Sequence, residues 1–253
     1  MTAHLAEDLV IDVGNSRIKL GLFNQGRITS LATAAHHDLE AVEQFCGGHP
    51  PRCIIVGSVA GPNEGFVHAL GRLAPVKEVT GGSPSPVRSL YQTPATFGVD
   101  RLANVVGAAA LFPQRPVLAI DLGTCITYDL VDELAVHQGG NISPGLHMRA
   151  RAMHAYSARL PLVDPHPGTP LLGTGTASSL AAGCHHGLLM ELAGFIGAFR
   201  QQHRHLAVVL TGGDAPNAAR ALKNGIFAHP TLTLIGLHAI ALYDPDPRPV
   251  AHP

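Results

Sequence analysis

The sequence predicts an α/β protein built from two similar halves, and three observations support this. The segment Leu9–Phe23 contains two apolar runs joined at Gly14, and the second run alternates, which is typical of a β-hairpin. A second hairpin of the same kind is predicted over residues 116–131. After each hairpin, short apolar runs alternate with helical patterns. We therefore predict an N-terminal half of residues 1–115 and a C-terminal half of residues 116–253, each of ordinary domain size.

The remaining elements follow from hydrophobic periodicity and from the positions of turn residues. We expect strands at residues 28–33, 52–59 and 206–210, and helices at residues 37–45, 101–111, 177–203, 215–223 and 232–243.

Composition and charge restrict the possible partners. The chain has 253 residues, of which 46% are hydrophobic and only 14% are charged, against a usual charged share of about 25%. A chain of this length buries enough surface to fold without disulfides or structural metals. The formal net charge of −1 gives no long-range basic field, so nucleic acid is not expected as a partner.

Cysteine usage and hydropathy predict a cytoplasmic protein with no membrane partner. The four cysteines form no CxxC pair, and residues 1–8 lack the basic and apolar regions of a secretion signal. Two long uncharged stretches are interrupted, the first by three prolines between Pro165 and Pro170 and the second by His229 and Pro230. Both are interpreted as buried elements, because a spanning helix needs about 20 apolar residues. The 16 histidines show no zinc-ligand spacing with cysteine.

The two predicted hairpins carry the same turn pattern. Asp12-Val-Gly-Asn15 and Asp121-Leu-Gly-Thr124 each place an aspartate and a glycine at the end of an apolar strand. Backbone N–H groups in such a turn can surround phosphate oxygens. The two carboxylates would act through Mg²⁺ or another cation, because direct contact with phosphate is repulsive. The alternative is that each aspartate only satisfies its own turn, and the repetition favours the phosphate interpretation.

A third glycine turn and several missing motifs narrow the nucleotide interpretation. Residues 210–215, Leu-Thr-Gly-Gly-Asp-Ala, follow a predicted strand and open a helix, which suits a phosphorylated or flat ligand. The sequence contains no G-x-x-x-x-G-K-[ST] motif and no strand-borne G-x-G-x-x-G, so P-loop and dinucleotide-binding folds are not expected. It also lacks the G-x-S-x-G elbow of serine hydrolases.

Four motifs together closely resemble the type III pantothenate kinases, also called the Bvg accessory factor family. They are Asp12-Val-Gly-Asn-Ser-Arg-Ile-Lys19, Gly98-Val-Asp-Arg101, Asp121-Leu-Gly-Thr124 and Gly139-Gly-Asn-Ile-Ser-Pro-Gly145, in this order. The resemblance implies a duplicated actin-like fold of the acetate and sugar kinase/Hsp70/actin class, with two RNase H-like halves. It also implies ATP-dependent phosphorylation of pantothenate to 4′-phosphopantothenate, the first step of coenzyme A biosynthesis, by a homodimer.

The same resemblance implies a role for individual residues. Asp100 falls on the family's proton acceptor, and Asp121 on the ligand of a monovalent cation, K⁺ or NH₄⁺. Mg²⁺ accompanies the nucleotide. The implied ATP contacts are Asp12, Val13, Gly14, Asn15, Ser16, Arg17, Ile18, Lys19 and Thr124. The implied pantothenate contacts are Tyr91, Gly98, Val99, Asp100, Arg101 and Thr176. The surface between Ala177 and Ala198 is our expectation for the subunit contact.

Some alternatives stay open from the residues alone. Arg101 either holds the substrate carboxylate or supports the fold through a buried pair. Ser16 stands where the family commonly has threonine, which keeps the hydroxyl. A non-catalytic regulator that keeps the nucleotide site, or a kinase for another small alcohol, would share much of this pattern. The presence of Asp100 beside Arg101 favours catalysis, because a binding module has no use for a carboxylate that orients a hydroxyl.

Overall fold

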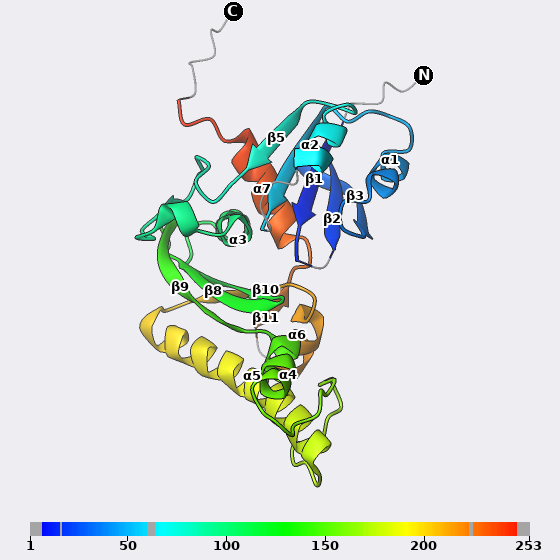
Figure 1. The fold of residues 1–253 in the computed structure, drawn as a ribbon. Helices are drawn as coiled ribbons and strands as arrows, with labels where there is room; N and C mark the ends of the chain where they lie inside the picture. The colour runs from blue at the N-terminus through cyan, green and yellow to red at the C-terminus, as the bar shows by residue number, and fades with distance from the viewer. Residues whose placement is uncertain (1–6, 16, 60–63, 223–224, 247–253) are drawn as a thin grey trace, which may run out of the picture. The chain divides into compact units, whose positions relative to one another are not determined.

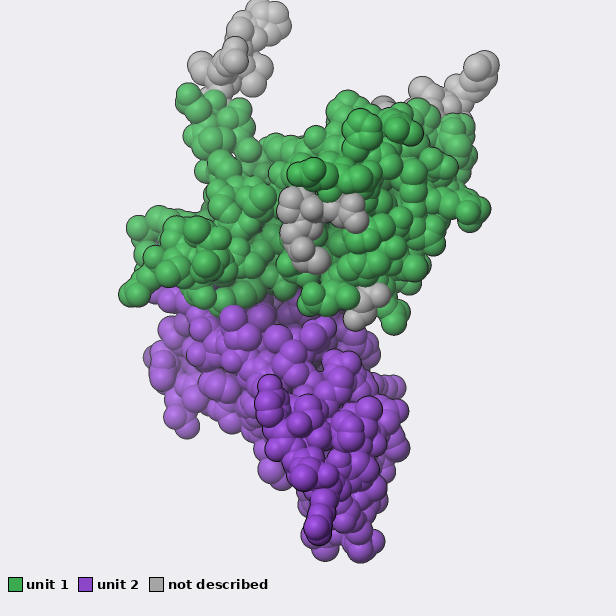
Figure 2. Space-filling model, in the orientation of Figure 1, with its two compact units in different colours: residues 1–111, 231–253 green, residues 112–230 purple. Residues whose placement is uncertain are grey.

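The protein forms two compact units (Figure 2). The first comprises residues 1–111 and 231–253, and the second comprises residues 112–230. A computed structural model describes residues 7–15, 17–59, 64–222 and 225–246. Each unit is described by itself below.

The first unit is built on a mixed five-stranded sheet (Figure 1). Its strands are β1 (Asp8–Val13), β2 (Ile18–Asn24), β3 (Arg27–Ala34), β4 (Cys53–Ser58) and β5 (Val76–Val79). Their order is β3-β2-β1-β4-β5, with β1, β2 and β3 antiparallel and β1, β4 and β5 parallel. The predicted hairpin is confirmed, and its register places Asp12 opposite Lys19.

Helices cover both faces of this sheet. Helices α1 (Leu39–Phe45) and α2 (Glu64–Leu70) pack on one face through Val42, Phe66 and Leu70, which are at most 6% exposed. On the other side, α7 (Leu232–Leu242) contacts β1, β4 and β5. Helix α3 (Val99–Leu111) packs along α7. A short strand, β6 (Arg88–Ser89), and a 3₁₀ helix, η1 (Pro94–Thr96), lie between β5 and α3 in the chain.

The contact between α3 and α7 requires a glycine. A side chain on Gly236 would place its Cβ 1.7 Å from the carbonyl oxygen of Ala103. Only glycine lets the two backbones approach this closely. The C-terminal helix is therefore fitted tightly to α3 and is part of the core of the first unit.

The second unit repeats the topology of the first. Its strands are β7 (Val117–Leu122), β8 (Cys125–Val131), β9 (Val136–Pro144), β10 (Ala207–Thr211) and β11 (Ile226–Ala228). They follow the order β9-β8-β7-β10-β11, with an antiparallel meander on one side of β7 and parallel strands on the other. This is the same arrangement as in the first unit. Asp12 and Asp121 each occupy the penultimate position of the first strand of their unit.

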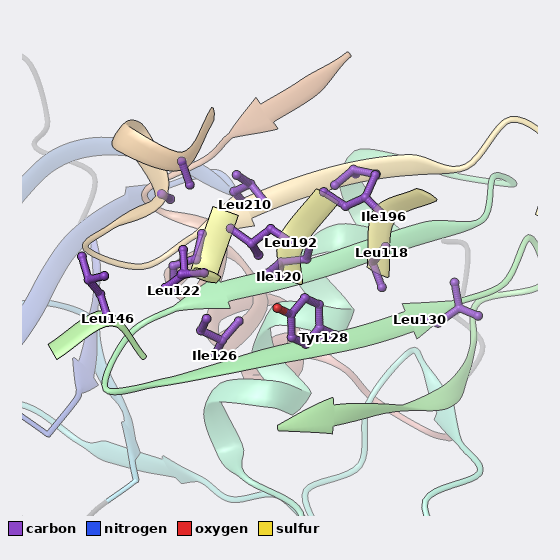
Figure 3. Close-up of a cluster of buried hydrophobic side chains, with 14 of the residues drawn as sticks. Leu118, Ile120, Leu122, Ile126, Tyr128, Leu130, Leu146, Leu192, Ile196 and Leu210 are labelled. Carbon is purple, nitrogen blue, oxygen red and sulfur yellow. The ribbon is translucent and has the colours of Figure 1, made fainter. Parts of the chain in front are cut away.

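Three helices cover one face of the second sheet (Figure 1). They are α4 (Leu146–Ala155), α5 (Thr176–Gln202) and α6 (Ala215–Leu222). Figure 3 shows the core between them and the sheet, where Leu192 and Ile196 of α5 meet Ile120 and Tyr128 of β7 and β8. Alternate residues of β7 point into this core, so Asp121 faces the opposite side of the sheet.

Most predicted elements are confirmed within one or two residues. The predicted helix 215–223 is seen to end at Leu222, and its last residue lies outside the described part. Helices α2 and α4 and strands β5, β6, β9 and β11 were not predicted. The predicted boundary near residue 115 separates two repeats of the sequence, whereas the two compact units are defined by their internal contacts. The boundary between the repeats therefore stays a prediction. Among the described residues, no helix is both long and apolar enough to cross a membrane.

A buried carboxylate ties the first strand of the first unit to its last helix. Asp8, 2% exposed, accepts hydrogen bonds from Arg52 at 2.8 and 2.5 Å and from the Cys53 thiol at 3.2 Å. Its Oδ2 also lies 3.1 Å from Nε2 of His238 in α7, whose ring stacks on Phe23. Burial alone would raise the pKa of Asp8, but the hydrogen bonds from Arg52, Cys53 and His238 outweigh it and lower the pKa.

Replacing Asp8 with asparagine is expected to destabilise the protein in a pH-dependent way. Because the pKa of Asp8 is lower in the folded state, its ionised form adds stability above the ordinary carboxyl pKa of about 4, and this contribution is lost as the pH falls from that value through the lower pKa of the folded state. At pH 7 we expect Asp8→Asn to lose about 1.5–3 kcal/mol, the range for hydrogen bonds to charged groups. Urea unfolding at pH 7 and at a pH below the folded-state pKa of Asp8 measures the loss in both states of ionisation. The exposed control Asp246→Asn should lose stability at neither pH, and an equal loss for Asp8→Asn at both pH values would contradict the ionic role.

Candidate functional site

The first predicted phosphate turn follows β1. The N–H of Gly14 donates to the carbonyl of Arg17 at 3.2 Å, and the carbonyl of Gly14 is hydrogen-bonded to Nε2 of His36. Asp12 is buried and lies 3.8 Å from Nζ of Lys19. Lys19 therefore shares the face of Asp12, whereas Asn15 and Arg17 are exposed in the turn. Ser16 lies outside the described residues.

The second predicted turn has the same place in the second unit. Asp121 and Thr124 are both half-buried, and Gly123 between them donates its N–H to the carbonyl of Cys125 at 3.1 Å. Asp121 and Thr124 thus lie on one tight turn between β7 and β8. The carboxylate and the hydroxyl that the sequence pattern selected belong to one local structure.

Two other backbone segments press against this turn. The N–H of Gly145 donates to the carbonyl of Thr124 at 3.1 Å, and a Cβ on Gly145 would lie 2.3 Å from the Gly123 oxygen. On the other side, a Cβ on Gly212 would lie 2.5 Å from Oδ1 of Asp121. Gly212 also has φ of +90°, which favours glycine. The motif Gly139–Gly145 and the third glycine turn therefore hold the second turn from two sides, a role that the sequence did not show.

A buried hydroxyl beside Asp121 offers a further oxygen ligand. Thr211 pairs with Asp121 in the parallel register of β10 and β7, so the two side chains point to the same face. Thr211 is 0% exposed, and its Oγ1 has no hydrogen-bond partner among the described residues. A buried unpaired hydroxyl is unfavourable unless something binds it. A carboxylate and a hydroxyl oxygen at one place fit a hard cation such as K⁺ or Mg²⁺, and the sequence analysis missed Thr211.

A cavity of about 190 Å³ lies beside the third glycine turn in the second unit. Its lining includes the apolar side chains of Leu188 and Ala218, while His147, His185 and Asp214 supply polar groups. Burial raises the pKa of Asp214, and burial together with the neighbouring imidazoles lowers the pKa of His185. A lining of apolar side chains with a few polar groups suits a flat heterocycle. Within the described part of the chain, no three or more His, Cys, Asp or Glu side chains are grouped to hold a metal ion.

The residues predicted to contact the second substrate gather in the first unit. Arg101, 4% exposed, has its guanidinium carbon 5.0 Å from the ring centroid of Tyr91 and 5.1 Å from that of Phe97. Its Nη1 also donates to the Tyr91 hydroxyl at 3.3 Å. The two rings therefore fix the guanidinium in place. The structure thus shows a packing role for Arg101, and its role toward substrate stays a prediction.

Asp100 is the second residue of α3 and lies next to this cluster. Its Oδ1 accepts the N–H of Arg101 at 2.8 Å, a bond that fixes the carboxylate at the helix start. A Cβ on Gly98 would meet this oxygen at 2.5 Å, so the glycine of the motif leaves room for it. Val99 is buried and anchors the helix.

Thr176, the remaining predicted contact, begins α5 in the second unit and is exposed there.

Solved structures with a similar fold include the following two. A Baf-family protein from Campylobacter jejuni matches with a TM-score of 0.61 and 18% identity, covering 92% of this chain and 96% of that one. A ROK family glucokinase from Streptomyces griseus, solved with glucose and AMPPNP, matches with a TM-score of 0.53 and 14% identity, covering 92% and 98%. At these identities the likeness concerns the fold. With the repeated strand order, it confirms the predicted duplicated actin-like α/β fold.

Sequence relatives are much closer. A type III pantothenate kinase of Bacteroides fragilis is 40% identical over 238 residues, covering 94% of this chain and 98% of the relative. Those of Porphyromonas gingivalis and Cytophaga hutchinsonii are each 38% identical, covering 94% of this chain and at least 98% of their own. The sequence profile described as type III pantothenate kinase matches residues 8–198. The chain therefore belongs to the type III pantothenate kinase family.

Proposed function

We propose that this protein transfers the γ-phosphoryl group of ATP to pantothenate, giving 4′-phosphopantothenate and ADP at the start of coenzyme A biosynthesis. Membership of the kinase family supports this activity, with ATP and a divalent metal ion as its cofactors. The observation that carries the assignment to particular residues is the cluster in the first unit, where Asp100 is fixed beside the ring-bound Arg101. We place the reaction in the cytoplasm.

Asp100 is proposed to orient the hydroxyl group of pantothenate and to accept its proton. A carboxylate is a weak base toward a primary alcohol, so it cannot remove the proton in the ground state. Phosphoryl transfer passes through a loose transition state, in which the proton can leave late and positioning is sufficient. The proposed pantothenate contacts are Tyr91, Gly98, Val99, Arg101 and Thr176. The buried guanidinium of Arg101 suits the carboxylate of that substrate.

The two repeated turns are proposed to contact the phosphates of ATP. Backbone N–H groups of the stretch from Asp12 to Lys19, and Thr124, supply donors for phosphate oxygens. Asp12 would hold the divalent ion through its waters. That ion neutralises charge that develops on the transferring phosphoryl group. The cavity beside Asp214, with Leu188 and Ala218 in its lining, is the proposed place of the adenine ring.

A monovalent cation, K⁺ or NH₄⁺, is proposed to bind at Asp121. Thr211 supplies a second oxygen, because its buried hydroxyl lacks a partner among the described residues and points to the same face as Asp121. The cation would place positive charge next to the Thr124 turn.

The proposed assembly is a homodimer formed through α5. Gly183, Gly187, Gly194 and Gly197 lie on one face of this helix by their spacing, and a Cβ on any of them would meet no atom within 4 Å. Each glycine lowers helix stability by up to about 1 kcal/mol relative to alanine. A second copy packed closely against this face would account for their presence. Thr176 begins the same helix, which would bring the pantothenate site near the interface.

Replacing Asp100 with asparagine should abolish most turnover. Loss of a positioned proton acceptor costs about 10²- to 10⁴-fold in rate, while binding of ATP does not depend on it. A coupled assay of pantothenate-dependent ADP release measures the rate, and calorimetry measures ATP affinity. The exposed control Asp244→Asn should match the wild type. Unchanged turnover of Asp100→Asn would overturn its role, and a wild-type protein that releases no ADP with or without K⁺ would instead support a regulator.

Replacing Asp121 with alanine should remove the activation by K⁺, because the only charged ligand of the proposed ion is lost. Thr211→Val should weaken K⁺ activation. Without K⁺, Thr211→Val should keep or raise the Tm, because it removes a buried hydroxyl that has no partner among the residues that the structure describes. K⁺ titrations of activity and of Tm measure both effects. A normal K⁺ response in Asp121→Ala would contradict the site.

Replacing Gly187 or Gly194 with leucine should convert the dimer into a monomer, because the side chain would keep the two α5 helices apart. Sedimentation velocity measures the oligomeric state. The alanine variant at each position serves as the matched control and should dissociate far less. A monomeric wild type, or a leucine variant that dimerises as tightly as the wild type, would contradict this interface.

A further inference from the structure

Glu191 of α5 is the centre of a hydrogen-bond network that the proposed mechanism does not use. Its Oε1 accepts the hydroxyl of Tyr128 at 2.8 Å and that of Ser143 at 2.5 Å. Its Oε2 accepts Nη2 of Arg149 at 2.5 Å. The network therefore joins α5 to strand β8, to the end of β9 and to α4.

The network holds the ionised, partly buried carboxylate of Glu191 beside the core of the second unit. Tyr128 is fully buried and belongs to the core of the second unit (Figure 3). Burial alone would raise the pKa of Glu191, but hydrogen bonds from Ser143, Arg149 and Tyr128 outweigh it and lower the pKa. Burial and the bond to Glu191 raise the pKa of Tyr128. The ionised carboxylate of Glu191 thus accepts hydrogen bonds from three donors. If the charge of Glu191 were removed, each donor would lose a charged acceptor.

The donors to Glu191 lead directly to the Thr124 turn. Arg149 also donates to the carbonyl of Pro144 at 2.9 Å and to Oγ of Ser143 at 3.1 Å. The next residue is Gly145, whose N–H donates to the carbonyl of Thr124. Because Gly145 is packed against the Gly123 and Thr124 carbonyls, a shift of Ser143 and Pro144 must move this turn or break that contact.

We infer that Glu191 is a positioning residue for the phosphoryl-transfer reaction. It acts through Ser143, Arg149 and Gly145 to fix the Thr124 turn in the position that the phosphates of ATP require. Glu191 makes no proposed contact with a substrate. The inference rests on the proposed contact between Thr124 and ATP, and it adds the residue that holds that contact in place.

The isosteric variant Glu191→Gln tests this inference. The amide oxygen of the glutamine can still accept hydrogen bonds. Its NH₂ group, however, must face either the guanidinium of Arg149 or the hydroxyls of Tyr128 and Ser143. We expect kcat/KM for ATP to fall about tenfold or more, since a 1 Å displacement of a catalytic contact can cost about 10²-fold. The KM for pantothenate should stay unchanged. A purely structural role would lower the Tm without this selective loss.

Two further variants complete the test. Glu133→Gln, at an exposed glutamate of the same unit, is the matched control and should behave as the wild type. Arg149→Lys keeps the charge but loses the planar group that reaches Glu191 and Pro144 together, so it should reproduce the ATP defect in milder form. If Glu191→Gln does not fold, Arg149→Lys tests the inference in its place.

Thr124→Ala, alone and combined with Glu191→Gln, separates the inference from the proposed function. If Glu191 acts through Thr124, the double variant should lose much less than the product of the single losses. Multiplicative losses, or normal ATP kinetics in folded Glu191→Gln and Arg149→Lys, would overturn the role of Glu191. Normal ATP kinetics in Thr124→Ala would overturn the ATP role of Thr124, and with it this inference. Pantothenate-dependent turnover in that variant would leave the kinase activity itself intact.

Discussion

The packing of backbone around the Asp121–Thr124 turn is the constraint on which the second unit depends. Gly145 and Gly212 bring two separate segments within contact of this turn, and neither position has room for a side chain. The segments arrive from the end of β9 and from the end of β10. Both strands must therefore end level with β7, which sets the lengths and registers of the sheet around the candidate site.

The two halves keep the same acidic position but support it differently. In the first unit, Asp12 is paired with Lys19, and the following turn is held by its own Gly14–Arg17 hydrogen bond and by His36. In the second unit, the backbone at Gly145 and at Gly212 packs against the turn that follows Asp121. The duplication thus preserved strand order and the place of the carboxylate, while its surroundings diverged. This divergence agrees with distinct proposed roles, at a divalent ion for Asp12 and at a monovalent ion for Asp121.

Local patterns predicted the parts of the fold whose causes are local. Both hairpins and the long helix α5 follow from alternation and periodicity in the sequence. Strand β9 could not be predicted in this way, because Gly139, Gly140 and Pro144 are unusual in a strand and are tolerated here by pairing with β8.

The residues of the candidate site also divide into those that local motifs predict and those that only long-range contacts reveal. Motifs identified Asp100, Asp121 and Thr124, whereas Thr211 and Glu191 gain their significance only from contacts far along the chain. A lone threonine at the end of a strand or a lone glutamate in a helix carries no distinguishing pattern. The membership of α7 in the first unit is likewise a long-range property, set by Gly236 against Ala103 and by His238 against Asp8.

That position of α7 has a consequence for synthesis on the ribosome. The first 111 residues leave the ribosome early, yet the helix that covers β1 and β4 is translated after the whole second unit. The second unit can therefore finish folding first, although it starts later in the chain. Until α7 leaves the ribosome, the part of the first sheet that this helix covers stays exposed, and a nascent chain stalled before residue 231 would present it to chaperones and to aggregation.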